Sequence, residues 1–229
     1  MKIKGVIIAF ISAVLFVCCE QGNGDIVSNE RKAANFNRVI SHGSGNVNIH
    51  FSEDYKVIVT TDSNIQDNIE VKAIDNTLHI ERDSGNYNPT KLIIDIYMPE
   101  LKAFTLSGSG KIKINSGSTS NLTINLSGSG NIDCQNYDTQ NVNITISGSG
   151  NVKAKASTTL KANLSGSGSI SAQNSEVQNA EVTLSGSASI KLWVRDSLTG
   201  KISGSGSVLY KGSPSINIKI TGSGRVKPL

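Results

Sequence analysis

The stretch INLSGSGNIDC, residues 124–134, contains the four-residue motif that decides the fold of this chain. The motif, Ser-Gly-Ser-Gly, lies between two short segments in which apolar and polar residues alternate. It recurs with its first residue at positions 107, 127, 147, 165, 185, 203 and, with Thr in place of the first Ser, 221, at spacings of 20, 20, 18, 20, 18 and 18 residues. A nearly constant period indicates one supersecondary unit that is repeated along the chain.

The residues on both sides of the motif fall into apolar columns. The residue just before the motif is Leu106, Leu126, Ile146, Leu164, Leu184, Ile202 and Ile220 in the seven copies. The second residue after it is Ile112, Ile132, Val152, Ile170, Ile190, Val208 and Val226. The position two residues farther out on each side is again mostly apolar, and Thr, Asn, Lys and Ser lie between these apolar positions. This alternation with a period of two is typical of half-buried strands.

Two strands and two turns in 18 to 20 residues fit either a hairpin or one coil of a β-solenoid. Hairpins favour two-residue turns, whereas this motif is longer and the columns keep their register in every copy. We therefore predict an all-β fold, a single-stranded β-solenoid with seven coils over residues 107–229. Successive coils should stack at about 4.8 Å, with like side chains above one another.

Glycine is expected at the corners of this solenoid because stacked neighbours leave little room for a Cβ. Serine hydroxyls are expected to bond the corner amides. Ala188 replaces the second glycine in one copy, so that position does not always require a positive φ. The expected structural glycines are Gly108, Gly110, Gly128, Gly130, Gly148, Gly150, Gly166, Gly168, Gly204, Gly206, Gly222 and Gly224.

Residues 36–106 are interpreted as an N-terminal β region that is continuous with the solenoid and caps it. A first Gly-Ser-Gly turn follows His42, although Ile40 is one place out of register with the later columns. The pair Asp75 and Asn76 predicts a hairpin turn, and Pro99 is expected to end a strand. Residues 19–35 are polar and contain glycine, which favours a tether.

The first residues are typical of an export signal. Lys2 and Lys4 precede an apolar run that is too short to span a bilayer, so residues 1–18 are interpreted as a signal peptide. The sequence LFVCCE resembles the lipobox of bacterial lipoproteins, with Cys19 as the lipid attachment site; the alternative is an ordinary secreted protein. A lipid anchor would make the membrane a partner and place the protein in the cell envelope, at the outer membrane and cell surface or facing the periplasm.

Only Cys134 remains after such processing, and its place in an apolar column predicts a buried, inert thiol. No catalytic motif is found, and the acidic residues of the repeats are scattered, which disfavours a paired-carboxylate glycosidase. We therefore expect a protein that is not an enzyme and needs no cofactor or metal. Residues 20–106 hold 13 acidic and 8 basic residues, whereas residues 107–229 hold 5 acidic and 12 basic ones.

One outward column of the repeats stands out because lysine occupies it in every other coil. The third residue after the motif is Lys113, Asp133, Lys153, Ser171, Lys191, Leu209 and Lys227, and Lys111, Lys155 and Arg225 are near in sequence. These lysines could bind an anionic glycan or lipopolysaccharide; the simpler interpretation is that they deter sheet-to-sheet aggregation. Trp193, in an outward position, is a candidate sugar platform or interface residue. Nucleic acid is not an expected partner, since no aromatics interleave the lysines.

The chain resembles the auto-transporter adhesin head domain family, the head GIN domain. The resemblance rests on FNRVISHGSGNVNIHF, NTLHI and IYMPELKAFTLSGSG, and on the repeated SGSGNI and SGSGNV, and covers about residues 36–229. It implies an exported lipoprotein, as found mostly in Bacteroidota, with a right-handed β-helix of pectin-lyase-like type. It brings no catalytic residues. The hypotheses are an adhesin or envelope-glycan binder, a structural envelope protein that assembles into homo-oligomers, and, least favoured, a carbohydrate-active enzyme.

Overall fold

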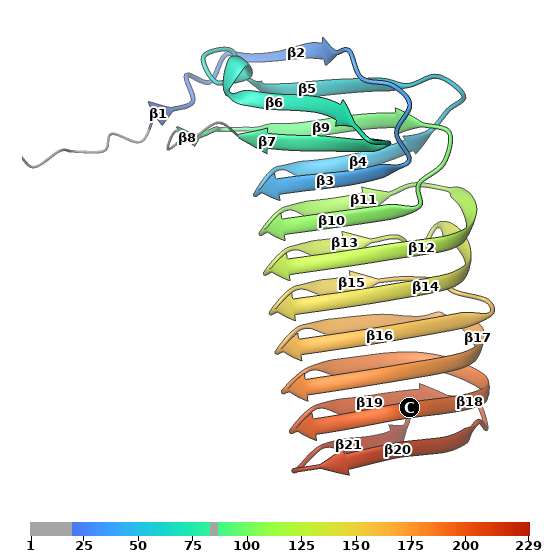
Figure 1. Cartoon of the computed structure of the whole chain (residues 1–229). Helices are drawn as coiled ribbons and strands as arrows, with labels where there is room; N and C mark the ends of the chain where they lie inside the picture. Colours follow the sequence, from blue (N-terminus) through green and yellow to red (C-terminus); the bar gives the residue numbers. More distant parts are fainter. Residues whose placement is uncertain (1–19, 83–86) are drawn as a thin grey trace, which may run out of the picture.

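The computed structural model describes residues 20–82 and 87–229 and confirms the all-β solenoid. Figure 1 shows a stack of about six turns, built from two facing layers of parallel strands and closed at one end by an antiparallel cap. The seven Ser-Gly-Ser-Gly corners bound six complete turns, one fewer than the seven coils that the sequence predicts. The corners lie along the left edge of the view.

Two layers of strands line the stack, here called the front and rear sheets as they appear in Figure 1. The front sheet contains β3 (Arg38–Gly43), β10 (Ala103–Gly108), β12 (Gly117–Gly128), β14 (Tyr137–Gly148), β16 (Thr159–Gly166) and β20 (Ser215–Thr221). The rear sheet contains β4 (Asn46–Phe51), β11 (Lys111–Ile114), β13 (Asn131–Asp133), β15 (Asn151–Lys153), β19 (Ser207–Lys211) and β21 (Arg225–Pro228). Two long strands bend from the rear sheet into the front one, β17 (Ser169–Gly186) and β18 (Ser189–Gly204).

The corners turn because the first glycine of each motif adopts a conformation that other residues avoid. Gly128 has φ +118°, and a Cβ there would lie 2.5 Å from the carbonyl oxygen of Gly108 in the preceding coil. The second glycine has no positive φ, which explains why Ala188 fits. The amide of Ser129 donates to the carbonyl of Gly108 at 3.1 Å. The expectation that serine hydroxyls bond the corner amides is therefore wrong, because the backbone of the preceding coil accepts these bonds.

The interior is a continuous ladder of aliphatic side chains. Leu106 pairs in register with Leu126 and Leu126 with Ile146, and all three are at most 2% exposed. The same order holds on the rear sheet, where Ile112 pairs with Ile132. Cys134 lies in this ladder, and burial, with a smaller contribution from the charge of Asp133, raises its pKa to about 12. The prediction of a buried, inert thiol is confirmed.

The cap consists of the remaining N-terminal strands, and it reverses the strand direction. Its elements are β1 (Glu20–Gln21), β2 (Ile26–Arg31), β5 (Lys56–Asp62), the 3₁₀ helix η1 (Gln66–Asn68), β6 (Ile69–Ile74), β7 (Thr77–Arg82), β8 (Tyr87–Asn88) and β9 (Leu92–Met98). β7 and β9 continue the two sheets in parallel beyond β3 and β4, whereas β5 and β6 pair with β9 and β7 in antiparallel fashion. Asp75 and Asn76, both with positive φ, form the β6–β7 hairpin turn as predicted.

The prediction of a tether over residues 19–35 is wrong for the part that the structure describes. β2 pairs with β5 along its whole length, and β1 pairs with β8. The carboxylate of Asp62, fully buried, fixes this segment by accepting the amide of Gly24 at 2.8 Å and the amide and hydroxyl of Thr90 at 2.8 and 2.6 Å. The segment is thus part of the folded cap. Cys19 and the expected signal peptide lie outside the described residues.

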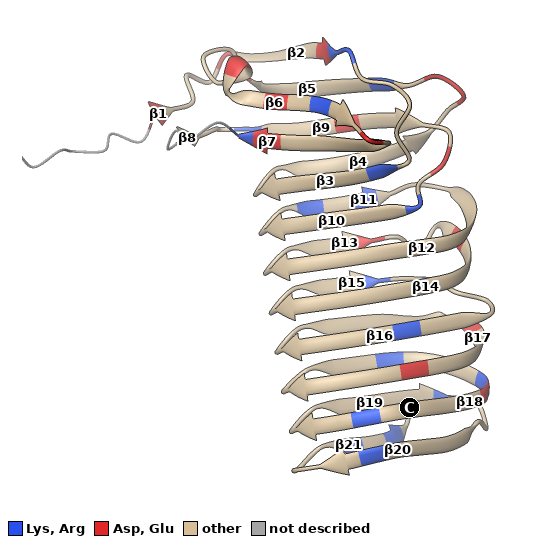
Figure 2. Ribbon diagram, in the orientation of Figure 1, with Lys and Arg blue, Asp and Glu red and all other residues tan. Residues whose placement is uncertain are grey.

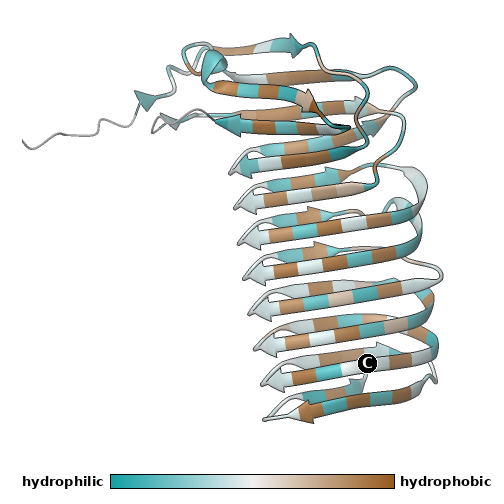
Figure 3. Ribbon diagram, in the orientation of Figure 1, coloured by the Kyte–Doolittle hydropathy of each residue, from teal (hydrophilic) through white to brown (hydrophobic). Residues whose placement is uncertain are grey.

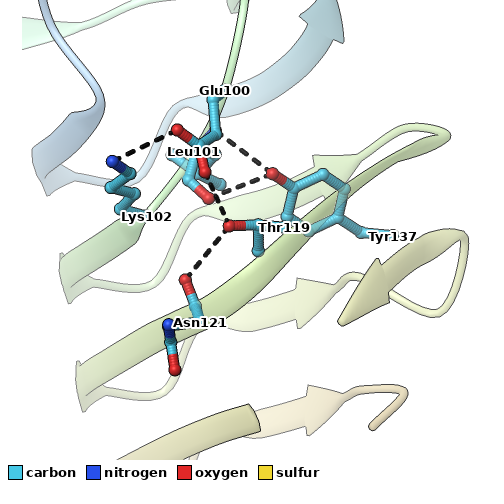
Figure 4. Close-up of polar contacts among 6 residues, drawn as sticks. All are labelled: Glu100, Leu101, Lys102, Thr119, Asn121 and Tyr137. Carbon is cyan, nitrogen blue, oxygen red and sulfur yellow. Dashed lines mark hydrogen bonds and ion pairs between the residues drawn. The ribbon is translucent and has the colours of Figure 1, made fainter. Parts of the chain in front are cut away.

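The chain leaves the cap through a crossover that skips one level of the stack. β9 pairs with β4, but the next strand, β10, pairs with β3 from the other side. Residues 99–102 therefore pass the level of β3 and β4. Figure 4 shows how the crossover is fixed: the Tyr137 hydroxyl donates to the carbonyl of Leu101 at 3.0 Å and accepts its amide at 3.2 Å.

The ring of Tyr137 also reaches across a coil. It stacks on Phe51 with a centroid separation of 4.7 Å and an angle of 4°. Gly117 pairs with Tyr137 in the adjacent coil, and a Cβ on Gly117 would lie 2.6 Å from the Phe51 ring. The absence of a side chain at this position therefore allows the two rings to meet. The stack ties β4, the rear strand next to the cap, to the second coil of the repeats.

At the opposite end of the solenoid, no strand of the described residues covers β20 and β21. Figure 3 shows the brown and teal alternation continuing into the last strands. The apolar residues there are exposed, Ile216 to 43% and Ile220 to 42%, although the residues with which they pair one coil inside, Leu198 and Ile202, are at most 1% exposed.

Candidate ligand-binding surface

The lysine column lies on the outer face of the rear sheet. In-register pairing places Lys113 beside Asp133 and Asp133 beside Lys153, and the same column continues through Ser171, Lys191, Leu209 and Lys227. Figure 2 shows the change from blue to red to blue from β11 to β15. The lysines thus recur at every second coil, about 10 Å apart at the usual strand spacing.

Two lysines of this column, Lys113 and Lys153, share one shallow groove with Lys111. Lys111, Lys113 and Lys153, all exposed, line a volume of about 530 Å³ together with Asn46, Asn48, Ile93, Ile112, Asn131 and Asp133. No ion pair to the three lysines is found among the described residues. Their ammonium groups therefore face solvent beside amide side chains that can donate and accept hydrogen bonds. We call this the lysine groove.

Two other residues singled out in the sequence lie elsewhere. Lys155 points to Asp138, with 2.5 Å between Nζ and Oδ1, and lines a different depression of about 650 Å³ that also includes Glu100. Trp193 lies on the rear strand part of β18, half-buried, with the Lys211 ammonium 5.6 Å from its ring centroid. One face of the indole is thus already covered. The structure does not join Lys155 or Trp193 to the lysine groove.

A polar cluster that the sequence did not indicate lies beside the groove. The Asp95 carboxylate accepts from His50 Nε2 at 3.2 Å and from the Asn48 amide at 2.9 Å. His50 Nδ1 lies 3.1 Å from the side-chain nitrogen of Asn115, and its ring stacks on Tyr97 at 4.7 Å. In a neutral imidazole one nitrogen donates and the other accepts, so both are engaged here. This arrangement leaves His50 no free nitrogen to act as a base.

The front sheet carries a second depression of about 740 Å³ near the crossover. It is lined by hydroxyl and amide side chains, among them Thr105, Thr123, Asn121 and Asn125, and by the charged residues Arg38, Glu100 and Lys102. Glu100 is already engaged, since its carboxylate pairs with Lys102 at 3.3 Å and accepts the Thr119 hydroxyl at 2.9 Å (Figure 4). This surface is polar and nearly neutral, unlike the lysine groove.

In residues 20–82 and 87–229 no group of three or more His, Cys, Asp or Glu side chains could hold a metal ion. The same residues contain no helix that is long and apolar enough to cross a membrane. What the geometry provides is a shallow, lysine-lined groove on the rear sheet and polar depressions elsewhere.

Known proteins share this fold. The family model described as "Putative auto-transporter adhesin, head GIN domain" matches residues 35–214. A crystal structure of a "putative adhesin" from Bacteroides fragilis is 29% identical, with a TM-score of 0.84, over 91% of this chain and 99% of that one. None of the curated proteins matches the chain.

Two further structures from Parabacteroides distasonis show the same fold at lower identity. A "putative adhesin" is 20% identical, with a TM-score of 0.81, over 93% of this chain and 100% of that one. A "putative lipid binding protein" is 23% identical, with a TM-score of 0.73, over 91% of this chain and 98% of that one.

Proposed function

The chain belongs to the head GIN domain family of auto-transporter adhesins, and from that premise we propose that it is a non-enzymatic binding module of the cell envelope whose lysine groove binds an anionic glycan. A surface adhesin needs a rigid face that presents the same groups at regular intervals. The ladder of the rear sheet provides such a face, because each coil repeats the register of the one before it.

The observation that carries the proposal is the convergence of Lys111, Lys113 and Lys153 on one groove without ion pairs to carboxylates in the described part of the chain. The groove also offers the amides of Asn46, Asn48 and Asn131, which can bond sugar hydroxyls. Lysines whose only role was to prevent sheet aggregation would need no such amide neighbours.

Affinity at a single groove is expected to be modest. An exposed ion pair contributes about 0.2–1 kcal/mol, so three lysines change the dissociation constant by a factor of roughly three to a hundred. Lys191 and Lys227 continue the column, so a polymeric ligand can contact several charges at once and gain by multivalency. A polysaccharide is therefore a better match than a small sugar.

The test is binding to an array of sulfated and carboxylated polysaccharides and to lipopolysaccharide. The triple variant Lys111→Gln, Lys113→Gln, Lys153→Gln should lose at least half of the salt-dependent signal. A matched control, Lys102→Gln, Lys161→Gln, Lys201→Gln, removes the same charge from the front sheet and the residue before β10 and should bind as the wild type does. Equal losses in both variants would show that net charge, and not the groove, controls binding.

We further propose that Cys19 carries the lipid that holds the protein in the envelope. The support is the lipobox-like sequence before it, since Cys19 itself lies outside the described residues. With Glu20 and Gln21 already paired to β8, such an anchor would hold the cap close to the membrane. Cys19→Ala should release the protein into the soluble fraction, and retention of lipid by this variant would show that a different residue is modified.

A further inference from the structure

We propose that the uncapped end of the solenoid is a docking surface for a second copy of this chain, which pairs through β20 in antiparallel fashion about Ile218. β20 is an edge strand whose outer backbone groups have no partner strand among the described residues. Its interior column, Ile216, Ile218 and Ile220, continues the core ladder but meets no further coil. Exposed apolar edge strands of this kind readily pair with another strand.

The cap explains why the partner contributes the same end rather than the opposite one. On β2, the outermost rear strand of the cap, the side chains above the buried Val57 and Val59 are Arg31 and Asn29. The Arg31 guanidinium already bonds the carbonyl and side-chain oxygen of Gln66 at 2.7 and 2.9 Å. An apolar end coil placed on this cap would have to desolvate polar and charged groups, which costs free energy.

Two-fold pairing of β20 with its own copy matches both apolar and charged residues. A register centred on Ile218 places Ile216 opposite Ile220 of the second copy, so that apolar side chains meet on the inner face. On the outer face it places Asn217 opposite Lys219 of the second copy, and no lysine faces a lysine. A two-fold contact of this kind closes on itself and does not grow into a fibre.

The size of the contact sets the expected affinity. Seven residues at about 3.3 Å each and two sheets about 10 Å apart give an end face of roughly 230 Å². This area is less than half of the about 800 Å² per partner of a standard interface. We therefore expect a reversible dimer that appears as the protein concentration is raised.

The test is sedimentation velocity on the chain without its first 19 residues, over roughly a hundredfold range of concentration. Asn217→Glu should strengthen the dimer and Asn217→Lys should weaken it. Each dimer contains two such cross-strand pairs, so the dissociation constant should change by about two- to thirty-fold in opposite directions. The inward-facing variant Ile218→Lys should abolish dimerisation.

Thr199 provides the matched control because it pairs with Asn217 in the same column, one coil inside the end. Thr199→Glu and Thr199→Lys carry the same charges but do not face a second copy, so they should leave the dimer within about twofold of the wild type. A monomer at every concentration, open-ended polymers, or equal effects at positions 199 and 217 would overturn the proposal. The residues tested lie on the front sheet, so these results are independent of the lysine groove.

Discussion

The two ends of the solenoid differ in how the ladder of strands is terminated. At the N-terminal end the parallel ladder gives way to antiparallel strands, and Asn29 and Arg31 take the places that aliphatic residues hold in the coils. At the C-terminal end the ladder stops without such a change, and Ile216 and Ile220 are more than 40% exposed. Repeat proteins require a polar terminal unit to remain soluble. The comparison shows that the cap has a role of its own, which is to end the ladder with polar groups, and that it is not merely the irregular start of the repeat.

One expected difference between an interior coil and the uncapped end lies at the corners. Gly128→Ala forces a φ of +118° on a residue with a Cβ, which costs about 1–3 kcal/mol, and the Cβ would also clash with Gly108 in the preceding coil. Gly222→Ala has a similar geometry in the last coil, 2.7 Å from the carbonyl of Gly204, but no coil follows it and the strand can move. In urea unfolding, Gly128→Ala should lower the free energy of unfolding at least twice as much as Gly222→Ala does. Equal losses would mean that the last coil is as constrained as the interior.

The same contrast should appear in the aliphatic column just before the corner. Leu126→Ala removes a side chain that is 2% exposed, and such truncations cost about 2–5 kcal/mol. Ile220→Ala removes its counterpart in the last coil, 42% exposed, and should cost less than about 1 kcal/mol in dilute protein. If the cost of Ile220→Ala rises with protein concentration in urea titrations, the end is covered by a second copy. A cost as large as that of Leu126→Ala in dilute protein would contradict the exposure of this end.

Much of the fold could be predicted because stacking imposes the same requirement on every coil. A column must be uniformly apolar when each residue contacts its equivalent above and below, so Leu106 to Ile202 could be placed in the core from the sequence alone. The turn at Asp75 and Asn76 was predictable for a local reason, since these residues tolerate positive φ. The lysine column followed from the same register.

The strand pairing inside the cap could not be predicted, because its contacts do not follow the order of the chain. The crossover makes β9 a neighbour of β4, so the cluster of His50 and Asp95 joins residues that no repeat period relates. β2 was mistaken for a tether because its inward positions include Asn29 and Arg31, which give no apolar alternation. Lys155 was grouped with the lysine column by its proximity in sequence, but it lies beyond the short strand β15 and points to Asp138.

A smaller effect is expected at the crossover between the cap and the coils. Tyr137→Phe keeps the ring stack on Phe51 but leaves the amide and carbonyl of Leu101 without the hydroxyl, which should cost about 1–3 kcal/mol. Tyr210→Phe is the matched control near the uncapped end, since no partner of that hydroxyl is found in the described part of the chain; it should change stability by less than about 0.5 kcal/mol. Thermal unfolding of the two variants compares them directly. If Tyr210→Phe lowered the thermal stability as much as Tyr137→Phe does, the hydrogen bonds to Leu101 would not account for a difference between the two ends.

The most local effect on stability is expected around Asp62 in the cap when the pH is lowered. Burial alone would raise the pKa of the Asp62 carboxyl, but the hydrogen bonds from Thr90, Gly24 and Lys91 outweigh it and hold the pKa below its usual value. A carboxyl with a lowered pKa in the folded state stabilises the protein above its unfolded pKa of about 3.9, and this contribution is lost as the pH falls through the folded value.

Amide exchange at Gly24 and Thr90 should therefore accelerate as the pH is lowered from about 4, relative to the intrinsic rates, whereas the amide of Ser205, which bonds the carbonyl of Gly186, should not. Asp62→Asn keeps the shape of the side chain but offers one acceptor oxygen instead of two, so the variant should show fast exchange at Gly24 and Thr90 already at neutral pH. If the amide of Ser205 exchanged faster on acidification together with those of Gly24 and Thr90, the cap would not open independently of the coils. The N-terminal end would then not be distinguished from the C-terminal end by a separately fixed unit.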